Sequence, residues 1–378
     1  MKRNNWPPIP LGRCAKLLSG GTPSKARLDF WEGDIPWVSS GEMTETRIHE
    51  TSLRITTEAA EAGSRLVPPN TVLAVVRGMS LAKEFRVSIT QREVAFNQDL
   101  KAFACAPELA PEFLFYALQA QREHIRDLAT EASHGTKKLE TDVLADVQIP
   151  LPSLVTQGQV VSILAAYDDL IENNRRRMAL LEESARLLYR EWFVHLRFPG
   201  HEHSHIVDGV PEGWTRRPLG ECVTLNYGKA LKAEERIPGE YPVYGSSGVV
   251  GMHEKPLVAG PAIILGRKGN VGSVYWSPKS CFPIDTVYFI EAPSSSLYLY
   301  YALQHMHFIS TDVAVPGLNR GLAYSRELLC PGESVVSAFL EVVTPVHAQL
   351  DKLDEQNHKL RAARDLLLPR LMSGEITV

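Results

Sequence analysis

A long, regular seam in the middle of the chain constrains its fold more than any other feature. From Gln157 to Trp192 the seam positions alternate at steps of three and four, and no Gly or Pro occurs between Gln159 and Arg197. This period is typical of the narrow seam of a coiled coil rather than of the wider stripe of a surface helix. Such a helix needs a partner. The seam residues that we expect to be buried are Leu164, Ile171, Asn174, Met178, Leu181 and Leu188.

A second seam with the same alternation runs from Val336 to Leu371, with Pro345 as its one early helix breaker. Each seam carries one Asn near its middle, and a buried Asn fixes register at a cost in stability. The arginines at 175–177 match an acidic cluster at 351–355 in depth along the helix. We therefore predict an antiparallel coiled coil within the chain; the alternative is two independent helices, each packed on its own domain. The second seam is represented by Leu350, Leu353, Asn357, Leu360 and Leu367.

Composition excludes several classes of protein. The chain has 378 residues, of which 44% are hydrophobic and 22% charged, which fits two or three globular domains. It has no run of 18 apolar residues and no signal-peptide pattern at its start, and its five cysteines lack metal-ligand spacing, so we expect a cytoplasmic protein with reduced thiols. The net charge of −4 argues against a nonspecific nucleic-acid binder, so DNA binding would depend on local patches or on a basic partner.

The chain repeats itself. Residues 6–14 resemble residues 214–222, and residues 113–119 resemble residues 298–304, in the same order. We predict an α+β fold in which two similar α/β domains are separated by the two long helices and related by a pseudo-twofold axis. Strand-like runs at 35–38, 71–76 and 86–89, and a helix over 111–128, are expected in the first domain. The predicted boundaries are 1–152 and 199–332 for the domains, and 153–198 and 333–378 for the helices.

Motifs of common enzymes are absent from the sequence. It has no Walker A loop, no Gly-x-Ser-x-Gly elbow, no Rossmann fingerprint and no Asn/Asp-Pro-Pro-aromatic tetrapeptide of adenine methyltransferases. Three alternating histidines, at 201, 203 and 205, are open to two interpretations, a metal site or a solvated linker, and the lack of further ligands beside them favours the linker. We therefore expect no catalytic residue, no metal and no cofactor in this chain.

Six segments, in this order, resemble the specificity subunit of type I restriction–modification systems. Two lie in the first domain, one in the central helix, two in the second domain and one at the C-terminal end: residues 33–43, 97–102, 168–177, 241–248, 266–272 and 366–376. The resemblance implies a subunit that reads a bipartite DNA target, one half per domain. It also implies helices that fix the gap and recruit two methyltransferase subunits. Those partners would bind S-adenosylmethionine, and restriction subunits using ATP and Mg could join them.

Two other functions remain open from the sequence: a protein–protein scaffold without a DNA role, and a stand-alone nuclease or methyltransferase. A sequence-selective footprint in the presence of a methyltransferase partner would exclude the scaffold. The enzyme hypothesis requires catalytic turnover by the purified chain.

DNA readout needs charged or amide side chains at groove edges and donors at phosphates, and Gly-rich loops allow close approach. Arg267 is the candidate to fork onto guanine, and Asn270 or Asn319 to bridge adenine. For any single residue, the alternative is a solvated hairpin turn, and Gln98 and Lys101 are as readily structural. The candidates are Lys25, Ser39, Ser40, Arg77, Gln98, Lys101, His134, Thr136, Lys137 and Lys138 in the first domain, and Tyr227, Lys229, Ser246, Ser247, Arg267, Lys268, Asn270, Asn319 and Arg320 in the second.

Overall fold

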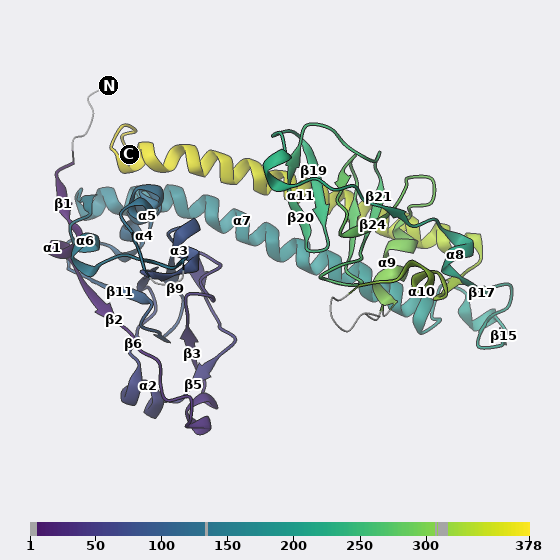
Figure 1. The fold of residues 1–378 in the computed structure, drawn as a ribbon, viewed down its shortest axis with the longest axis horizontal. Coiled ribbons are helices and arrows are strands. Elements are labelled where there is room, and N and C mark those ends of the chain that lie inside the picture. Colours follow the sequence, from purple (N-terminus) through teal and green to yellow (C-terminus); the bar gives the residue numbers. More distant parts are fainter. Residues whose placement is uncertain (1–5, 133–134, 307, 309–316) are drawn as a thin grey trace. The chain divides into compact units, whose positions relative to one another are not determined.

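The computed structural model describes residues 6–132, 135–306, 308 and 317–378, so the predicted site residue His134 lies outside the described residues. The chain divides into two compact units, one formed by Met1–Glu172 with Asn357–Val378 and the other by Asn173–Gln356. Each unit therefore combines one globular domain with part of each long helix (Figure 1). None of the described helices is long and apolar enough to span a membrane.

The first unit is built on two sheets. The larger has the order β2 (Ala15–Ser19), β11 (Leu100–Cys105), β7 (Val72–Val75), β9 (Val87–Thr90) and β4 (Arg47–Ile48). The smaller has the order β5 (Arg54–Ile55), β3 (Ile35–Val38), β10 (Val94–Phe96) and β6 (Leu66–Val67), with β3 and β10 parallel. β7 and β9 are buried along their whole length, which explains their nearly continuous apolar sequence. All three predicted strands of this domain are present.

Short elements close the first domain. β1 (Pro8–Pro10) pairs antiparallel with β14 (Gln148–Pro150), so the two ends of the domain form one ladder. The predicted helix over 111–128 is wrong in one respect. It is two helices, α4 (Pro111–Ala120) and α5 (Arg122–Asp127), because Gln121 between them leaves helical geometry at φ −107°. The other short elements are α1 (Leu11–Cys14), η1 (Leu28–Trp31), α2 (Thr57–Gly63), β8 (Arg77–Gly78), α3 (Met79–Lys83), β12 (Thr130–Glu131), β13 (Lys137–Lys138) and α6 (Thr141–Ala145).

The second unit repeats this plan. Its main sheet, β18 (Asn226–Tyr227), β24 (Val287–Ile290), β21 (Ala262–Gly266) and β22 (Val274–Ser277), has the order of β2-β11-β7-β9. Its other sheet, β20 (Gly248–His253), β19 (Tyr241–Gly245) and β23 (Phe282–Pro283), contains a parallel pair like β3 and β10. β17 (Thr215–Pro218) pairs with β25 (Glu327–Cys330) as β1 pairs with β14, and α8 (Leu219–Cys222), α9 (Leu297–His305) and α10 (Arg320–Tyr324) repeat α1, α4 and α6. The predicted internal duplication is confirmed.

The second unit also holds the segment that follows the first long helix. It contains η4 (His201–His203), β15 (Ile206–Val207), β16 (Val210–Pro211) and, further on, η5 (Ala233–Glu235). His201 and His203 both contact the Glu202 carboxylate, at 3.3 and 3.7 Å. Across the described residues, no group of three or more His, Cys, Asp or Glu is placed to hold a metal ion.

The two long helices pair antiparallel, as predicted. α7 (Leu154–Tyr189) ends in a π-helical turn, η3 (Arg190–Val194), and α11 (Glu333–Met372) runs unbroken through Pro345, which is exposed. In the first unit, the start of α7 (Val160, Leu164) shares a core with the end of α11 (Leu368, Leu371). In the second unit, the end of α7 shares a core with the start of α11. Opposite ends meet in each unit, and every position of both predicted seams, including both Asn, is buried or half-buried.

The buried face drifts by one residue near the helix ends. Tyr189 and Phe193 are buried while Leu188 and Trp192 are half-buried, and Leu368 is buried beside the half-buried Leu367. A straight helix turns about 20° per heptad relative to a 3.5-residue repeat, which accumulates to about one residue over five heptads. The strict alternation read from the sequence therefore holds in the middle of each helix and slips toward its end.

Candidate nucleic-acid interface

In the second unit, two arginines gather on one exposed tyrosine. Tyr227, at the end of β18, has 51% of its surface exposed. The guanidinium carbons of Arg267 and Arg320 lie 5.2 and 5.1 Å from the centre of its ring, within the range of a cation–π contact. Arg267 also lies 5.8 Å from the ring of Tyr288, whose pKa is raised to about 12, chiefly by burial. The three predicted residues Tyr227, Arg267 and Arg320 thus form one cationic cluster, which we call the Tyr227 cluster.

The loop that carries Arg267 is held close to its neighbours by backbone hydrogen bonds. The amides of Arg267 and Lys268 both donate to the Thr286 carbonyl, at 2.9 and 3.0 Å. Gly269 follows at φ +77°, a left-handed conformation that favours glycine. Ser273 Oγ donates to the Ser246 carbonyl at 2.7 Å, which ties this loop to the turn after β19. Lys268, Ser247 and Asn270 are exposed here, whereas Ser246 is only 9% exposed, so its side chain is mainly structural.

Asn319 begins α10 as its N-cap. Its Oδ1 accepts from the amides of Gly321 and Leu322, at 2.8 and 3.3 Å. A bidentate contact with adenine needs this oxygen as an acceptor. Base readout by Asn319 would therefore compete with capping, which is worth about 1 kcal/mol.

In the first unit, four cations and a serine hydroxyl gather at one edge. Lys138 of β13 pairs with Arg77 of β8, and Lys137 pairs with Gly78. Lys101 Nζ donates to Ser19 Oγ at 2.6 Å, and its pKa is lowered first by burial and then by the charge of Lys138. Lys138 also forms an ion pair with Glu140 at 2.6 Å. The β8–β13 edge therefore brings Arg77, Lys101, Lys137 and Lys138 together.

The remaining predicted residues are more scattered. Ser40 lies near this edge, because a Cβ on Gly78 would be 3.9 Å from its hydroxyl. Gln98 Oε1 accepts from Thr22 Oγ1 at 2.7 Å, so that side chain is engaged within the domain. Lys25 is exposed, in the loop before η1. Ser39 is half-buried in the loop after β3, Thr136 is half-buried just before β13, and Lys229 is exposed after β18.

Strand register shows that the two cationic sites occupy the same place in the repeated fold. Lys268 bridges Gly317 as Arg77 pairs with Lys138. In the main sheets, Gly266 of β21 pairs with Val287 as Val75 of β7 pairs with Leu100, so Gly266 and Val75 are equivalent positions. Lys268 and Arg77 each come two residues after these positions. In each unit the cation is followed by a glycine with positive φ, Gly269 at +77° and Gly78 at +131°. We call this shared feature the cation–glycine step.

By the same registers, Tyr227 and Tyr288 occupy the positions of Ser19 and Lys101. Sequence reasoning missed Ser19 and Tyr288 as members of these sites. The signal that could have identified the shared position is a basic residue and then a glycine, just after an apolar strand run in each half. Exposed guanidinium, ammonium and amide groups around a close-approach glycine suit phosphate and base-edge contacts.

The chain matches a known protein family. The family model of the type I restriction modification DNA specificity domain matches residues 4–183 and 211–320. The MjaIX type I restriction enzyme specificity subunit of Methanocaldococcus jannaschii is 22% identical over 99% of this chain and 94% of its own length. The EcoR124I/EcoR124II specificity subunit of Escherichia coli is 30% identical over 42% of this chain and 40% of its own length.

Among solved structures, the S subunit of a type I restriction–modification system from M. genitalium has a similar fold. The TM-score is 0.60 at 20% identity, over 98% of this chain and 97% of that one. The family match covers both copies of the repeated domain, with α7 included in its first segment almost to the end. The chain belongs to the family of type I restriction–modification DNA specificity subunits.

Proposed function

We propose that this chain reads a bipartite DNA target, with the β8–β13 edge of the first unit on one half-site and the Tyr227 cluster on the other. The observation that carries the proposal is the cation–glycine step, present at the same register in both copies of the fold. A repeated reader suits a target that is itself in two parts. Arg267 and Arg320 supply forks for guanine or phosphate, and Lys101, Lys137 and Lys138 supply point charges for phosphate.

The chain's acidic total bears on how tightly it binds DNA by itself. The net charge is −4, so few phosphates are neutralised by this chain alone. Affinity at a given salt concentration grows with the number of phosphates neutralised. We therefore propose that the isolated chain binds DNA weakly and that tight binding needs the partner subunits.

The chemistry belongs to those partners in our proposal. Two methyltransferase subunits carrying S-adenosylmethionine would dock on this chain, and restriction subunits using ATP and Mg could join them. The chain itself would act in the cytoplasm as the non-catalytic, DNA-reading part. Support comes from the relatives' names as specificity subunits and from the lack of catalytic motifs in the sequence.

The test is a methylome measured in cells that express this chain with a methyltransferase subunit. We expect methylation at one bipartite motif that disappears when this chain is omitted. Exchanging residues 6–150 for those of a relative should change one half of the motif and leave the other half intact. A motif without two parts, or one in which both halves change together, would contradict the proposal.

A further inference from the structure

The two copies of the domain contact the long helices through one equivalent tyrosine. Tyr116 of α4 and Tyr301 of α9 occupy the same position of the repeated segment, residues 113–119 and 298–304. The Tyr116 hydroxyl donates to Asp168 Oδ2 on α7 at 2.7 Å. The Tyr301 hydroxyl lies 2.8 Å from His347 Nε2 on α11. Each tyrosine therefore bonds to the helix that follows its own domain in the chain.

The helix residues are equivalent as well. Asp168 is 14 residues after Leu154, where α7 begins, and His347 is 14 residues after Glu333, where α11 begins (168 − 154 and 347 − 333). Burial raises the pKa of both Tyr116 and Tyr301, so each hydroxyl keeps its proton. Asp168 can only accept this proton, and a neutral His347 accepts it in the tautomer that carries its own proton on Nδ1. The same contact is thus present in both halves, although its acceptor differs.

The residue that packs beside the acceptor on the other long helix also differs between the two units. In the first unit, Arg364 of α11 donates to the second oxygen of Asp168 at 2.5 Å, and the Asp168 and Arg364 side chains are 10% and 20% exposed. The position on α7 that corresponds to Arg364, 31 residues from the start of the helix, is Ala185, buried in the second unit. A charged acceptor is therefore accompanied by a cation, and a neutral acceptor by a methyl group. This is the pattern that burial demands, since a buried charge needs a partner.

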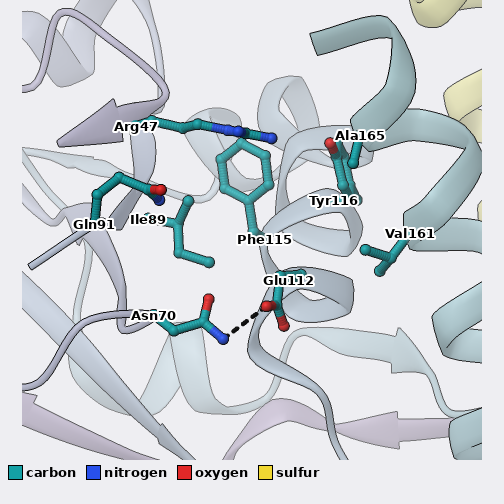
Figure 2. Close-up of a pocket in the computed structure, with 9 residues that line it drawn as sticks. All are labelled: Arg47, Asn70, Ile89, Gln91, Glu112, Phe115, Tyr116, Val161 and Ala165. Atoms are coloured by element: carbon teal, nitrogen blue, oxygen red, sulfur yellow. Dashed lines mark hydrogen bonds between the residues drawn. The ribbon is translucent and has the colours of Figure 1, made fainter. Parts of the chain in front are cut away.

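Beside the first contact the packing is open. A cavity of about 260 Å³ lies between the domain and α7, lined by Phe115 and Tyr116 on one side and by Val161 and Ala165 on the other (Figure 2). Arg47, at its edge, forms an ion pair with Asp169 at 2.8 Å. The start of α7 is anchored in the domain by the buried Val160 and Leu164 and by Gln157, which accepts from the Ala110 amide and donates to the Glu108 carbonyl. Further along the helix, apolar packing leaves this space unfilled, so polar contacts at Asp168 and Asp169 contribute to how the domain is turned on the helix.

We propose that Tyr116 with Asp168, and Tyr301 with His347, are equivalent joints whose residues are positioning residues: they set the rotation of each recognition domain on the helix that follows it, and hence the aim of its DNA-reading surface. The part about DNA rests on the proposed function. The joints themselves rest on the hydrogen bonds of Tyr116 and Tyr301 and on the repeat.

The first test uses the complete complex of this chain with methyltransferase subunits and compares cognate DNA with DNA altered in one half-site. Tyr116→Phe should reduce discrimination at the half-site read by the first domain about tenfold, and Tyr301→Phe at the other, as expected for one hydrogen bond to a charged or buried group. The control is Ser277→Ala, which removes a buried hydroxyl bonded to the Lys279 carbonyl inside the second domain, at the end of β21 away from Arg267. It should leave discrimination unchanged.

Full discrimination in both joint variants, equal losses at both half-sites, or an equal loss in Ser277→Ala would overturn the positioning role. If the unmodified complex shows no bipartite target, the proposed function fails. The joints are then decided by a second measurement without DNA. Asp168→His alone should shift the unfolding equilibrium of the first unit about tenfold or more, and Asp168→His with Arg364→Ala should recover most of that loss, because it installs the neutral pair of the second unit. No recovery in the double variant would overturn the equivalence of the joints.

The neutral joint also predicts a pH dependence confined to the second unit. Burial lowers the pKa of His347 to about 4, from 6.5 in the unfolded chain. Above pH 6.5 the His347 imidazole is neutral in both the folded and the unfolded state. As the pH falls from 6.5 to 4, the imidazole of the unfolded state is protonated first, so the second unit loses stability. The groups around this site are Glu182 and Arg186 on α7, Tyr300 and Tyr301 on α9, and Asp351 one turn further along α11.

Hydrogen exchange of peptides from α9 and α11, compared between this chain and His347→Gln, measures the effect. The unmodified chain should lose up to about two orders of magnitude in the opening equilibrium between pH 6.5 and 4 relative to the variant, which keeps an acceptor but cannot be protonated. Identical pH profiles would show that His347 is not held neutral by the joint.

Discussion

Replacing both Arg267 and Arg320 by alanine is expected to weaken binding of the assembled complex to its target by roughly two to three orders of magnitude. Both guanidinium groups lie within 5.2 Å of the Tyr227 ring centre, so one pair of substitutions removes the whole cationic part of the Tyr227 cluster. A well-placed bidentate contact to a base is worth about 1–3 kcal/mol, so the loss of two such contacts reaches this range even though neighbours on one ring do not add fully. Titration at one fixed salt concentration measures the loss.

Two further double variants show whether that loss of affinity comes from base contacts, from phosphate contacts or from the removal of any two cations. Arg217→Ala with Lys255→Ala removes two exposed cations of the same unit that already lie beside Glu221 and Glu254, and should change affinity little. Arg267→Lys with Arg320→Lys keeps the charge but not the planar fork. If the arginines read bases, the lysine variant loses specificity while its salt dependence is preserved. Full specificity in the lysine variant would assign the cluster to phosphate contacts. An equal loss in the Arg217→Ala, Lys255→Ala control would remove the cluster from the interface.

Phe339→Ala should have the largest effect on stability, a loss of about 3–5 kcal/mol from the second unit. Phe339 lies on α11 with none of its surface exposed. Its ring centre is 5.1 Å from that of Phe193 and 6.2 Å from that of Tyr189, both at the end of α7, and 6.1 Å from that of Tyr301. Truncation leaves a cavity at the point where both helices and the domain meet.

The free energy of unfolding of the second unit, measured by chemical denaturation with hydrogen exchange as the readout, checks this expectation. Val342→Ala is the matched control on the same helix, because Val342 is 49% exposed. It should cost less than about 0.5 kcal/mol. Similar small losses for both variants would mean that the pairing of α7 with α11 does not depend on this aromatic cluster.

The sequence predicted the helices better than any other part of the fold, because a periodic seam is a local signal repeated many times. The antiparallel pairing, the buried Asn174 and Asn357, and the duplication are all confirmed. The slip from Leu188 to Tyr189 was missed, because the 3.5-residue template ignores the slow drift of a straight helix. The split of the expected helix at Gln121 was also missed, since it carries no Gly or Pro signal.

The candidate interface was only partly predictable. The Gly-rich loop over 266–272 made Arg267 and Lys268 candidates, but residue type could not show that Ser246 is buried or that Asn319 caps a helix. The joints were out of reach for a different reason. Asp168 meets Tyr116 and Arg364 across separations of 52 and 196 residues, and no local pattern reports contacts at such distances. Only the fold brings these side chains together.

The β1–β14 and β17–β25 ladders have a consequence for how such chains can evolve. Each ladder joins the first strand of a domain to its last, so the polypeptide enters and leaves the domain side by side. A domain attached in this way is a cassette: recombination within the two strands of one ladder can replace everything between them while α7 and α11 keep their register. If each domain reads one half-site, as we propose, new specificities can then be acquired half by half, without rebuilding the helices.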